Sequence, residues 1–244
     1  MFTQSSGRLK NSVLGNLSLM DFALMRPFLQ TVALKERAIL QEPRKRIEYV
    51  NFIETGIVSH RTHATECVLE FAMVGYQGVV GASVVLGSKV AAHQSVALVA
   101  GTALRIHVDD LQRAIDERPQ IRERLLQHIE ALMIHGSQTA LCGVRHPLER
   151  RLASWLCLAC DALDRNVFPI THDHLSMILG LRRAGITETL DRFKEAGLIR
   201  KTRGVLEVCD RGRLAQKACG CYQIIARGYR YSGTVGQRDH QLAF

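Results

Sequence analysis

The sequence predicts an α+β protein with a β-rich N-terminal half, one long central helix and a C-terminal helix-turn-helix unit. Brief apolar bursts separated by turn residues fill the chain from Val32 to Val108, which is the pattern of many short strands. After Pro119, apolar residues recur three and four positions apart, as on one face of a long helix. Further on, two short helical patterns flank Gly180 and precede a basic hairpin, which is typical of a winged helix-turn-helix.

The N-terminal region is expected to be an all-β module, such as a small barrel or jelly roll, behind a leading helix. Apolar residues at helical spacing predict that helix over residues 12–29. Short strands are expected at residues 32–34, 38–40, 49–53, 56–59, 68–74, 79–80, 84–85, 96–100 and 104–108. Within the strand 68–74, Leu69 and Phe71 flank Glu70, so we expect the glutamate on the opposite, solvent-facing side.

The central region is expected to contain two helices. An aspartate pair at 109–110 can cap a short helix, and Pro119 suits the first turn of a longer one that runs to about Gly136. The apolar stripe of the long helix faces either the protein's own core or a second copy. Periodicity favours the second copy, and the predicted dimerisation residues are Ile121, Leu125, Ile129, Leu132 and Gly136. His128 and His135 flank the stripe, and we expect them to be solvated.

The strongest local signal lies in the C-terminal half. Residues 147–163 predict an amphipathic helix with Trp155 in its core. Thr171 then caps a short helix, Gly180 supplies a tight turn, and residues 182–196 form a second helix. A basic hairpin and a final strand complete a winged helix-turn-helix.

Basic residues at the start of the second helix and in the hairpin predict contacts with DNA. Because the N-terminus of a helix is partly positive, Arg182 and Arg183 would meet phosphate and base edges there. We expect Arg183 to reach a base edge, and Arg182 and Arg203 to contact phosphate. The predicted DNA-binding residues are Thr171, Arg182, Arg183, Thr187, Glu188, Arg192, Lys201 and Arg203. The alternative is a helical hairpin whose charges are only solvated.

The charge distribution supports a polyanionic partner for the C-terminal half. The 244-residue chain holds 32 Lys and Arg against 23 Asp and Glu, a net charge of +9. Residues 1–139 hold 15 basic against 13 acidic side chains, and residues 140–244 hold 17 against 10. The net charge is therefore +2 in the first part and +7 in the second, which places the polyanion on the second.

Neither a membrane protein nor an enzyme is indicated. Residues 71–88 carry no charge, but four glycines interrupt this run, so buried strands are favoured over a membrane span. The sequence has no nucleophile elbow, phosphate-cradling glycine loop or HExxH motif. We therefore expect no catalysis and no cofactor.

The seven cysteines, in a chain whose start is not a secretory signal, predict reduced thiols in a cytoplasmic protein. Cys157 and Cys160 lie inside a predicted helix, away from the helix N-terminus where CxxC thiolates form. Cys219 and Cys221 have no second spaced pair, because Cys209 is not part of a CxxC. We therefore expect no metal site and no redox pair, and a thiol- or metal-based redox protein is kept as an alternative.

Several segments resemble the Crp/Fnr superfamily of bacterial transcription regulators, over nearly the whole chain. The resembling segments are Glu54–Ser59, the glycine series Val74–Gly81, the long central helix and Ile170–Ile199. Leu179–Thr187 and Ala218–Tyr222 resemble a proteobacterial branch that has no settled effector. The resemblance implies a β-roll (jelly-roll, cyclic-nucleotide-binding-like) sensor domain, a dimerising helix and a winged helix-turn-helix. The expected segments are the sensor domain with its leading helix at 1–108, the linking and dimerisation helix at 109–139, the winged helix-turn-helix at 140–222 and a C-terminal tail at 223–244.

The chain departs from the cyclic-nucleotide-binding members of the superfamily at two positions. Those members follow the last glycine of the series with Glu, where this chain has Ala82. They also place an arginine on the cyclic phosphate, where this chain has Ala92 followed by His93. Without that arginine the phosphate loses its charge-assisted partner. An N-terminal cysteine cluster for an iron–sulfur centre is absent as well.

The resemblance therefore implies a cytoplasmic, homodimeric transcription regulator that reads a two-fold DNA operator, with RNA polymerase as a further partner. It implies no membrane association, and the effector is unknown and not expected to be cyclic AMP. Arg183 matches the arginine that cyclic-AMP-responsive members use on guanine, whereas Ala184 and Glu188 replace their Glu and second Arg. The operator is thus expected to differ from theirs. The alternatives are a cyclic-nucleotide-responsive regulator and a thiol- or metal-based redox-sensing protein.

Overall fold

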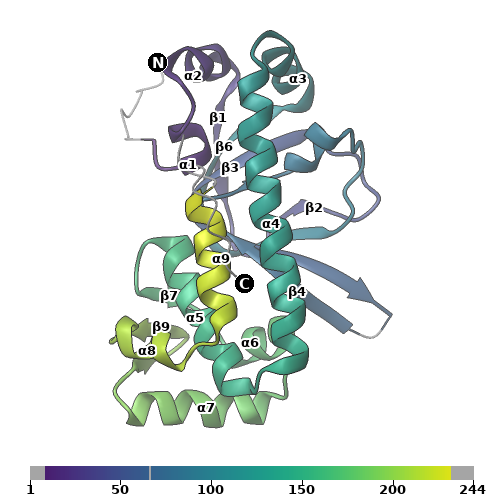
Figure 1. Cartoon of the computed structure of the whole chain (residues 1–244). Helices are drawn as coiled ribbons and strands as arrows, with labels where there is room; N and C mark the ends of the chain where they lie inside the picture. The colour runs from purple at the N-terminus through teal and green to yellow at the C-terminus, as the bar shows by residue number, and fades with distance from the viewer. Residues whose placement is uncertain (1–8, 66, 232–244) are drawn as a thin grey trace.

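A computed structural model describes residues 9–65 and 67–231 as a β-sheet domain, a long helix beside it and a C-terminal domain of helices with a small sheet (Figure 1). The main sheet is antiparallel in the order β1-β6-β3-β4, with β2 paired to β6 and β5 paired to β3. Its strands are β1 (Gln30–Leu34), β2 (Ile39–Gln41), β3 (Tyr49–Ala64), β4 (Cys67–Val74), β5 (Val79–Val80) and β6 (Gln94–His107). The predicted fold class is confirmed.

The strands are fewer and longer than the sequence indicated. Two pairs of expected short strands merge, one pair into β3 and the other into β6. Their register shifts around Thr55, next to Gly56, whose φ is +88°. A Cβ on Gly56 would lie 2.5 Å from the carbonyl oxygen of Val99. Such irregularities bend a continuous strand and interrupt its apolar pattern. The strand expected at 84–85 is wrong, because these residues lie in the 3₁₀ helix η2 (Ala82–Leu86).

The single leading helix expected over residues 12–29 is also wrong. The stretch forms α1 (Ser12–Gly15), α2 (Leu19–Met25) and the 3₁₀ turn η1 (Arg26–Phe28). The side chain of Asn11 accepts a hydrogen bond from the backbone N–H of Leu14 at 3.1 Å, and Ser18 accepts one from Asp21 at 3.1 Å. Ser18 therefore starts a second helix inside the stretch, because each N-cap satisfies a donor that the helix cannot.

The polar residue of β4 faces inward, contrary to the alternation expected from the sequence. Glu70 is buried and Leu69 is exposed. The Glu70 carboxyl group accepts hydrogen bonds from Trp155 Nε1–H at 2.7 Å and from the Ser59 hydroxyl. Burial raises the pKa of Glu70 to about 7 although these donors act in the opposite direction. A glutamate with such partners can be buried, so tertiary contacts override the strand pattern.

The central helices are α3 (Val108–Glu117) and α4 (Pro119–Arg145). α4 continues to Arg145 instead of ending near Gly136, and it crosses the expected boundary after residue 139 without a break. It runs beside both the sheet domain and the C-terminal domain (Figure 1). The long helix is therefore a shared support for the two domains.

The stripe predicted for dimerisation lies against the protein's own domains. Ile121 and Leu125 are each 1% exposed and pack into the core of the sheet domain, so their assignment to a dimer seam is wrong. Ile129 and Leu132 are partly buried and pack against the same domain. Gly136 is also partly buried. The internal face of α4 carries this stripe because a helix needs an apolar face wherever it covers a sheet.

His128 and His135 are buried, and the expectation that they are solvated is wrong. The backbone N–H of Val79 donates to His128 Nε2 at 3.0 Å, and His135 Nδ1 lies 3.0 Å from the Tyr229 hydroxyl. Burial lowers the pKa of His128 to about 4 and that of His135 to about 3. Both imidazoles are therefore neutral at pH 7 and join α4 to its neighbours.

The C-terminal domain combines six helical or strand elements of a winged helix-turn-helix with two closing helices. These elements are α5 (Leu148–Leu163), β7 (Val167–Pro169), α6 (His172–Leu179), α7 (Arg183–Glu195), β8 (Ile199–Thr202), β9 (Val205–Val208), α8 (Arg211–Lys217) and α9 (Gly220–Tyr231). The strand order is β7-β9-β8. No helix in the described part of the chain is both long and apolar enough to cross a membrane.

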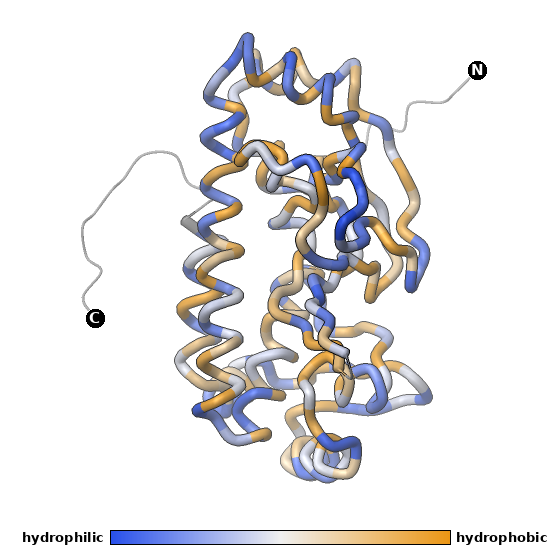
Figure 2. The backbone as a smooth tube through the Cα atoms, turned by 90° about the vertical axis from the view of Figure 1, so that its right-hand side faces the viewer, coloured by the Kyte–Doolittle hydropathy of each residue, from blue (hydrophilic) through white to orange (hydrophobic). Residues whose placement is uncertain are grey.

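The expected tail from residue 223 begins as a helix, because α9 continues to Tyr231. A Cβ on Gly228 would lie 3.5 Å from Cδ1 of Ile134, so α9 packs closely on α4. The two helices lie side by side, and polar and apolar residues alternate along both of them (Figure 2). Residues 232–244 of the expected tail lie outside the described residues.

The sheet domain and the C-terminal domain share one hydrophobic core, in which Met73 and Val99 of the sheet pack with Leu156 of α5. Gly75, just after β4, approaches α5 so closely that a Cβ there would lie 1.9 Å from the carbonyl oxygen of Ala162. β4 therefore touches the helix that supports the helix-turn-helix.

Candidate DNA-binding interface

α6 and α7 form the helix-turn-helix that the sequence predicts. Thr171 accepts a hydrogen bond from the backbone N–H of His174 at 3.2 Å and so caps α6. Gly180 makes the turn with a φ of +59°, which favours glycine. The inner faces of the two helices bury Leu175, Ile178, Ile186, Leu190 and Phe193. This core fixes α7 and directs its other side outward.

The outer side of α7 lies across the end of the molecule, at the bottom of Figure 1. Arg182 is its N-cap and Arg183 its first residue, and both are exposed. Glu188 is exposed one turn further on. Thr187 Oγ1 lies 2.8 Å from His172 Nδ1, which ties the start of α6 to α7. Two guanidinium groups thus stand at the positive end of an exposed helix.

The wing is the hairpin of β8 and β9. Its turn contains Arg203 and Gly204, and Gly204 has a φ of +75°. Arg203 is exposed in that turn, and no ion pair joins it or Arg182 to the described residues. Lys201 on β8 is more enclosed, and its Nζ lies 2.8 Å from Asp191 Oδ1 of α7. Among the described residues of the wing, Arg203 is thus without an ion-pair partner, whereas Lys201 is held by α7 and Arg200 is paired with Glu207 of β9.

Two arginines of α7 are paired with acids of other helices. Arg183 Nε lies 2.9 Å from Asp173 Oδ1 of α6, and both side chains are about two-thirds exposed, at 67% and 69%. Arg192 Nη1 lies 3.8 Å from Glu149 Oε2 of α5. Arg192 follows Arg183 by nine residues, which is two and a half helical turns. The two side chains are therefore on opposite faces of α7. Exposed pairs contribute only about 0–1 kcal/mol, so a phosphate or base can replace the carboxylate.

Thr171 and Arg182 are the N-caps of α6 and α7, and the other six residues predicted to contact DNA lie on α7 or in the wing. Arg192 is paired with Glu149 of α5. Asp173, the partner of Arg183, was missed by sequence reasoning, which has no signal for a pair across the turn.

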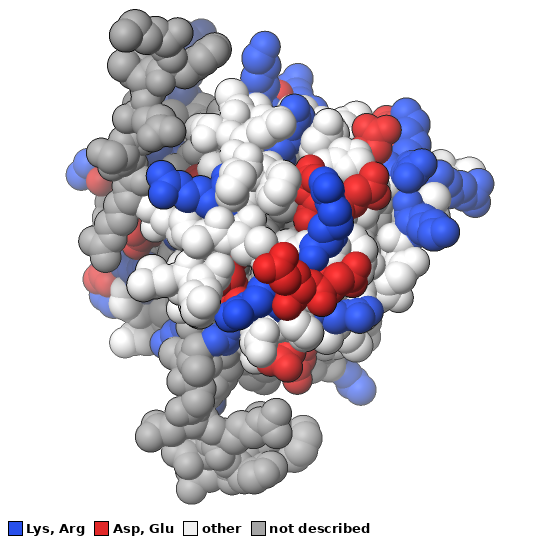
Figure 3. Space-filling view, turned by 90° about the horizontal axis from the view of Figure 1, so that it is seen from above, with Lys and Arg blue, Asp and Glu red and all other residues white. Residues whose placement is uncertain are grey.

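The opposite end of the molecule differs in its charge pattern. Seen from above, Lys and Arg side chains there alternate with Asp and Glu (Figure 3). Arg113 pairs with Asp110, and Arg118 Nε lies 2.7 Å from Asp21 Oδ1. At the α7 end, by contrast, Arg182 and Arg203 have no ion-pair partner among the described residues, which favours that end as the surface for a polyanion.

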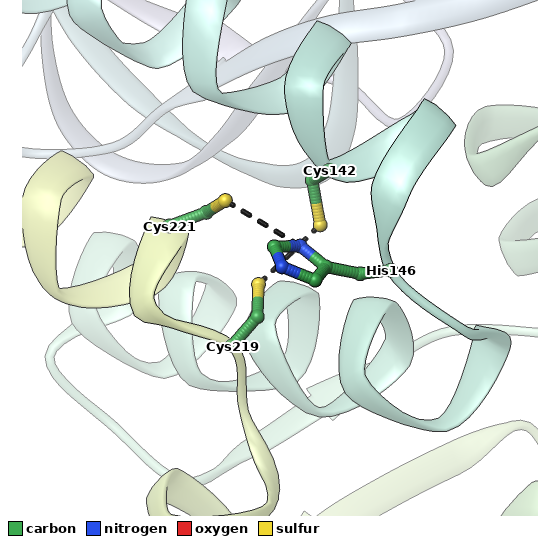
Figure 4. Close-up of side chains that lie close together, drawn as sticks. All are labelled: Cys142, His146, Cys219 and Cys221. Carbon is green, nitrogen blue, oxygen red and sulfur yellow. Dashed lines mark hydrogen bonds between the residues drawn. The ribbon is translucent and has the colours of Figure 1, made fainter.

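Five of the seven cysteines fall into two buried groups, and Cys67 and Cys209 are exposed. Cys157 and Cys160 lie inside α5, and burial raises their pKa to about 12 and about 11 respectively. These thiols stay protonated, unlike those of a redox CxxC pair. The second group joins three cysteines to an imidazole, and its members are Cys142, His146, Cys219 and Cys221 (Figure 4). Sequence reasoning missed it by searching for a second cysteine pair; the available signal was the four-residue spacing of Cys142 and His146 on one helix.

The described residues thus form a sheet domain joined by a long helix to a winged helix-turn-helix. Residues 150–217 match the Crp-like helix-turn-helix domain. The chain has the Crp/Fnr regulator fold, and the resemblance predicted from its motifs is confirmed at that level.

Three solved structures illustrate the likeness. FixK2 from Bradyrhizobium japonicum has a TM-score of 0.68 and 15% identity, over 79% of this chain and 98% of that one. A CRP-family transcriptional regulator from Thermus thermophilus has a TM-score of 0.63 and 14% identity, over 77% and 96%. The c-di-GMP-responsive regulator CLP from Xanthomonas campestris has a TM-score of 0.61 and 10% identity, over 79% and 100%. At these identities the likeness establishes the fold. A search of curated protein sequences finds no match.

Proposed function

We propose that the protein is a homodimeric transcription regulator that binds a two-fold symmetric DNA operator in the bacterial cytoplasm and acts on RNA polymerase. One observation carries this proposal: in a Crp-like helix-turn-helix domain, α7 presents Arg182 and Arg183 at its exposed N-terminus, beside the wing with Arg203. In this class of domain the second helix enters the major groove and its N-terminal residues reach base edges. The wing then lies along the phosphate backbone.

The two arginines have different roles in this complex. Arg183 extends from the start of α7 and is held by Asp173, so its guanidinium is positioned for the two acceptors of a guanine. Arg203 lies in the wing turn without an ion-pair partner among the described residues, which suits a phosphate contact.

We expect Arg183→Ala to relax base preference and Arg203→Ala to weaken binding to all sequences alike. Loss of a bidentate arginine removes about 1–3 kcal/mol of discrimination at one base pair. Loss of a phosphate contact reduces the slope of log K against log salt by about one. The measurement is a titration of single-base operator variants at several salt concentrations.

Arg113→Ala, at the opposite end of the molecule, is the matched control and should change neither quantity. Uniform weakening by both test variants, with base preference intact, would show that α7 does not read the bases.

A second copy is expected to pack on the exposed side of α4. The exposed apolar residues form a row displaced by one position from the buried stripe, with Leu126, Met133 and Val144 in line along the helix. Met133 is 71% and Val144 84% exposed. Dimerisation would cover this row and set two α7 helices at the spacing of an operator.

The effector is proposed to act through β4. Leu69 of β4 reaches the turn between α6 and α7, where a Cβ on Gly180 would lie 3.1 Å from its Cδ1. Glu70 of the same strand holds Trp155 of α5. A ligand-driven shift of β4 would therefore move the support of α7 directly.

Cyclic AMP and cyclic GMP are expected to bind weakly or not at all. At the position where cyclic-nucleotide-binding relatives carry the phosphate-binding arginine, the chain has Ala92, and Ala82 replaces their glutamate. Nε2 of the neighbouring His93 lies 3.2 Å from Nδ1 of His60. Burial lowers the pKa of His93. The imidazole of His93 therefore does not replace the positive charge of the missing arginine at pH 7. Isothermal titration calorimetry measures the affinity directly. A micromolar dissociation constant for either nucleotide would restore the cyclic-nucleotide-responsive alternative.

A further inference from the structure

The second cysteine group, here called the thiol–imidazole cluster, joins two segments that are far apart in sequence. Its members are Cys142, His146, Cys219 and Cys221. Cys142 lies in the last turn of α4 and His146 is the C-cap of that helix. Cys219 and Cys221 flank the first residue of α9. Figure 4 shows the three sulfur atoms and the imidazole ring converging on one point.

The cluster is compact enough for a single tetrahedral ion. The four ligand atoms all lie within 4.8 Å of one another. Cys142 Sγ lies 3.4 Å from Cys219 Sγ, and Cys221 Sγ lies 3.6 Å from His146 Nδ1. Zinc bonds of about 2.3 Å to sulfur and 2.0–2.1 Å to nitrogen place tetrahedral ligand atoms roughly 3.5–3.8 Å apart. A contact of 3.4 Å between the two sulfurs also excludes a disulfide bond in this structure.

The surroundings of the cluster favour a bound cation over a small apolar patch. The three cysteines are buried and His146 is half-buried, yet an imidazole nitrogen points at the sulfurs. Ser154 of α5 accepts a hydrogen bond from the backbone N–H of Cys219 at 3.1 Å and donates one to the Arg150 carbonyl at 2.9 Å. Such second-shell contacts hold a ligand segment in place.

Charge is also suited to a cation with three thiolates. Three thiolates and a neutral imidazole around Zn²⁺ leave one net negative charge, and Arg151 borders the same cavity as Cys142 and Cys221. A guanidinium there stabilises that net charge.

We propose that the thiol–imidazole cluster binds one structural zinc ion that fastens the start of α9 to the end of α4. Four protein ligands fill a tetrahedral shell and leave no open position, so the site is structural rather than catalytic. Soft thiolates exclude Mg²⁺ and Ca²⁺. An iron–sulfur cluster would need its cysteine sulfurs farther apart, because inorganic sulfides lie between the irons. The three thiol protons leave to solvent as the ion binds.

A zinc ion in the thiol–imidazole cluster would stabilise the contact between α9 and α4. α9 otherwise depends on contacts such as Gly228 with Ile134 and Tyr229 with His135. The zinc ion would cross-link the start of α9, in the C-terminal domain, to the end of α4, the helix proposed to dimerise. The site is independent of the proposed DNA contacts, which lie on α6, α7 and the wing.

The first test is the metal content of the full-length chain, purified without a polyhistidine tag and under reducing conditions without chelators. Mass spectrometry of the elements should find about one zinc per chain. Cys142→Ser and Cys219→Ser should each lose most of it. Cys157→Ser and Cys160→Ser are matched controls, because these buried thiols lie outside the cluster, and they should retain the zinc.

The second test has a wild-type arm that does not depend on any variant folding. The wild-type chain, stripped of zinc and titrated with Co²⁺, should develop the visible bands and the thiolate-to-cobalt charge-transfer band of a tetrahedral site. In His146→Ala the bands should shift and the zinc affinity should fall at least about 10- to 100-fold, the effect of second-shell changes alone. A wild-type chain that neither contains zinc nor gives the cobalt spectrum would overturn the proposal. So would iron in place of zinc, or a Cys142–Cys219 disulfide in the reduced preparation.

Discussion

Replacing Met133 and Val144 with glutamate should convert the proposed dimer into folded monomers. Both side chains are mostly exposed in the single chain, so the change leaves the core intact. In a dimer they would be buried against the second copy, where an unpaired carboxylate is strongly unfavourable. We expect the dimer dissociation constant to rise by at least about 100-fold. Analytical ultracentrifugation measures it.

DNA binding should fall with the loss of the dimer. Two linked reading heads gain roughly 10²- to 10⁴-fold over one through effective concentration. The double variant should therefore lose affinity for a two-fold operator on this scale, while its affinity for a half-site changes little.

Leu125→Glu is the informative comparison, because it is one position from the exposed row. Leu125 is 1% exposed and packs inside the sheet domain, where a charge costs several kcal/mol, roughly half the stability of a typical domain. This variant should lose its cooperative thermal transition. A double variant that keeps the dimer mass would contradict the proposed seam, and a Leu125→Glu chain that stays folded would contradict the packing of Leu125 in the core.

The one-residue displacement between the predicted stripe and the proposed dimer face has a physical origin. Consecutive apolar residues occur at Leu125–Leu126 and at Leu132–Met133, so two stripes about 100° apart on the helix fit the same periodicity. Only the position of the sheet domain decides which stripe is internal. The helix itself, the winged helix-turn-helix and its turn at Gly180 depend on local signals, and these were predictable.

Contacts between distant segments were not predictable in the same way. Glu70 breaks the alternation of β4 because Trp155, 85 positions later, donates a hydrogen bond to it. The side chains of the thiol–imidazole cluster come from residues 142–146 and 219–221, which the packing of α9 on α4 brings together. Spacing rules apply within one element, whereas these arrangements depend on tertiary structure.

Acidification from pH 7 to about 4.5 should destabilise the protein by several kcal/mol. The pKa of His128 is lowered to about 4 and that of His135 to about 3, against about 6.5 in the unfolded chain. A lowered histidine pKa means that the unfolded state takes up protons first. The stabilisation is therefore complete above about pH 6.5 and is lost as the pH falls toward the folded pKa. Each histidine accounts for roughly 2–3 kcal/mol by pH 4.5.

Glu70 changes the stability in the opposite direction, and the size of its contribution decides the net effect of acidification. Its pKa is raised to about 7, so its contribution is full at pH values below about 4.5 and is lost as the pH rises through 7. Between pH 7 and pH 4.5, protonation of Glu70 therefore stabilises the folded state by roughly 2–3 kcal/mol. Burial also lowers the pKa of His60 well below its usual value, which adds to the loss. The destabilisation from the three histidines is larger than the stabilisation from the one glutamate. The free energy of unfolding should therefore fall as the pH is lowered from 7 to 4.5.

His135→Phe is the variant that tests this account, with urea unfolding followed at pH 7 and at pH 4.5. At pH 7 it loses the contact with Tyr229 and is expected to be about 1 kcal/mol less stable than the wild type. Between the two pH values it should lose roughly 2–3 kcal/mol less than the wild type. His63→Asn is the matched control, because His63 is exposed on β3, and it should retain the full acid loss. Both variants keep the thiol–imidazole cluster, so release of a metal at low pH affects them equally. An unchanged acid loss in His135→Phe would mean that this imidazole is protonated in the folded protein, and that the contact between α4 and α9 opens before the protein unfolds.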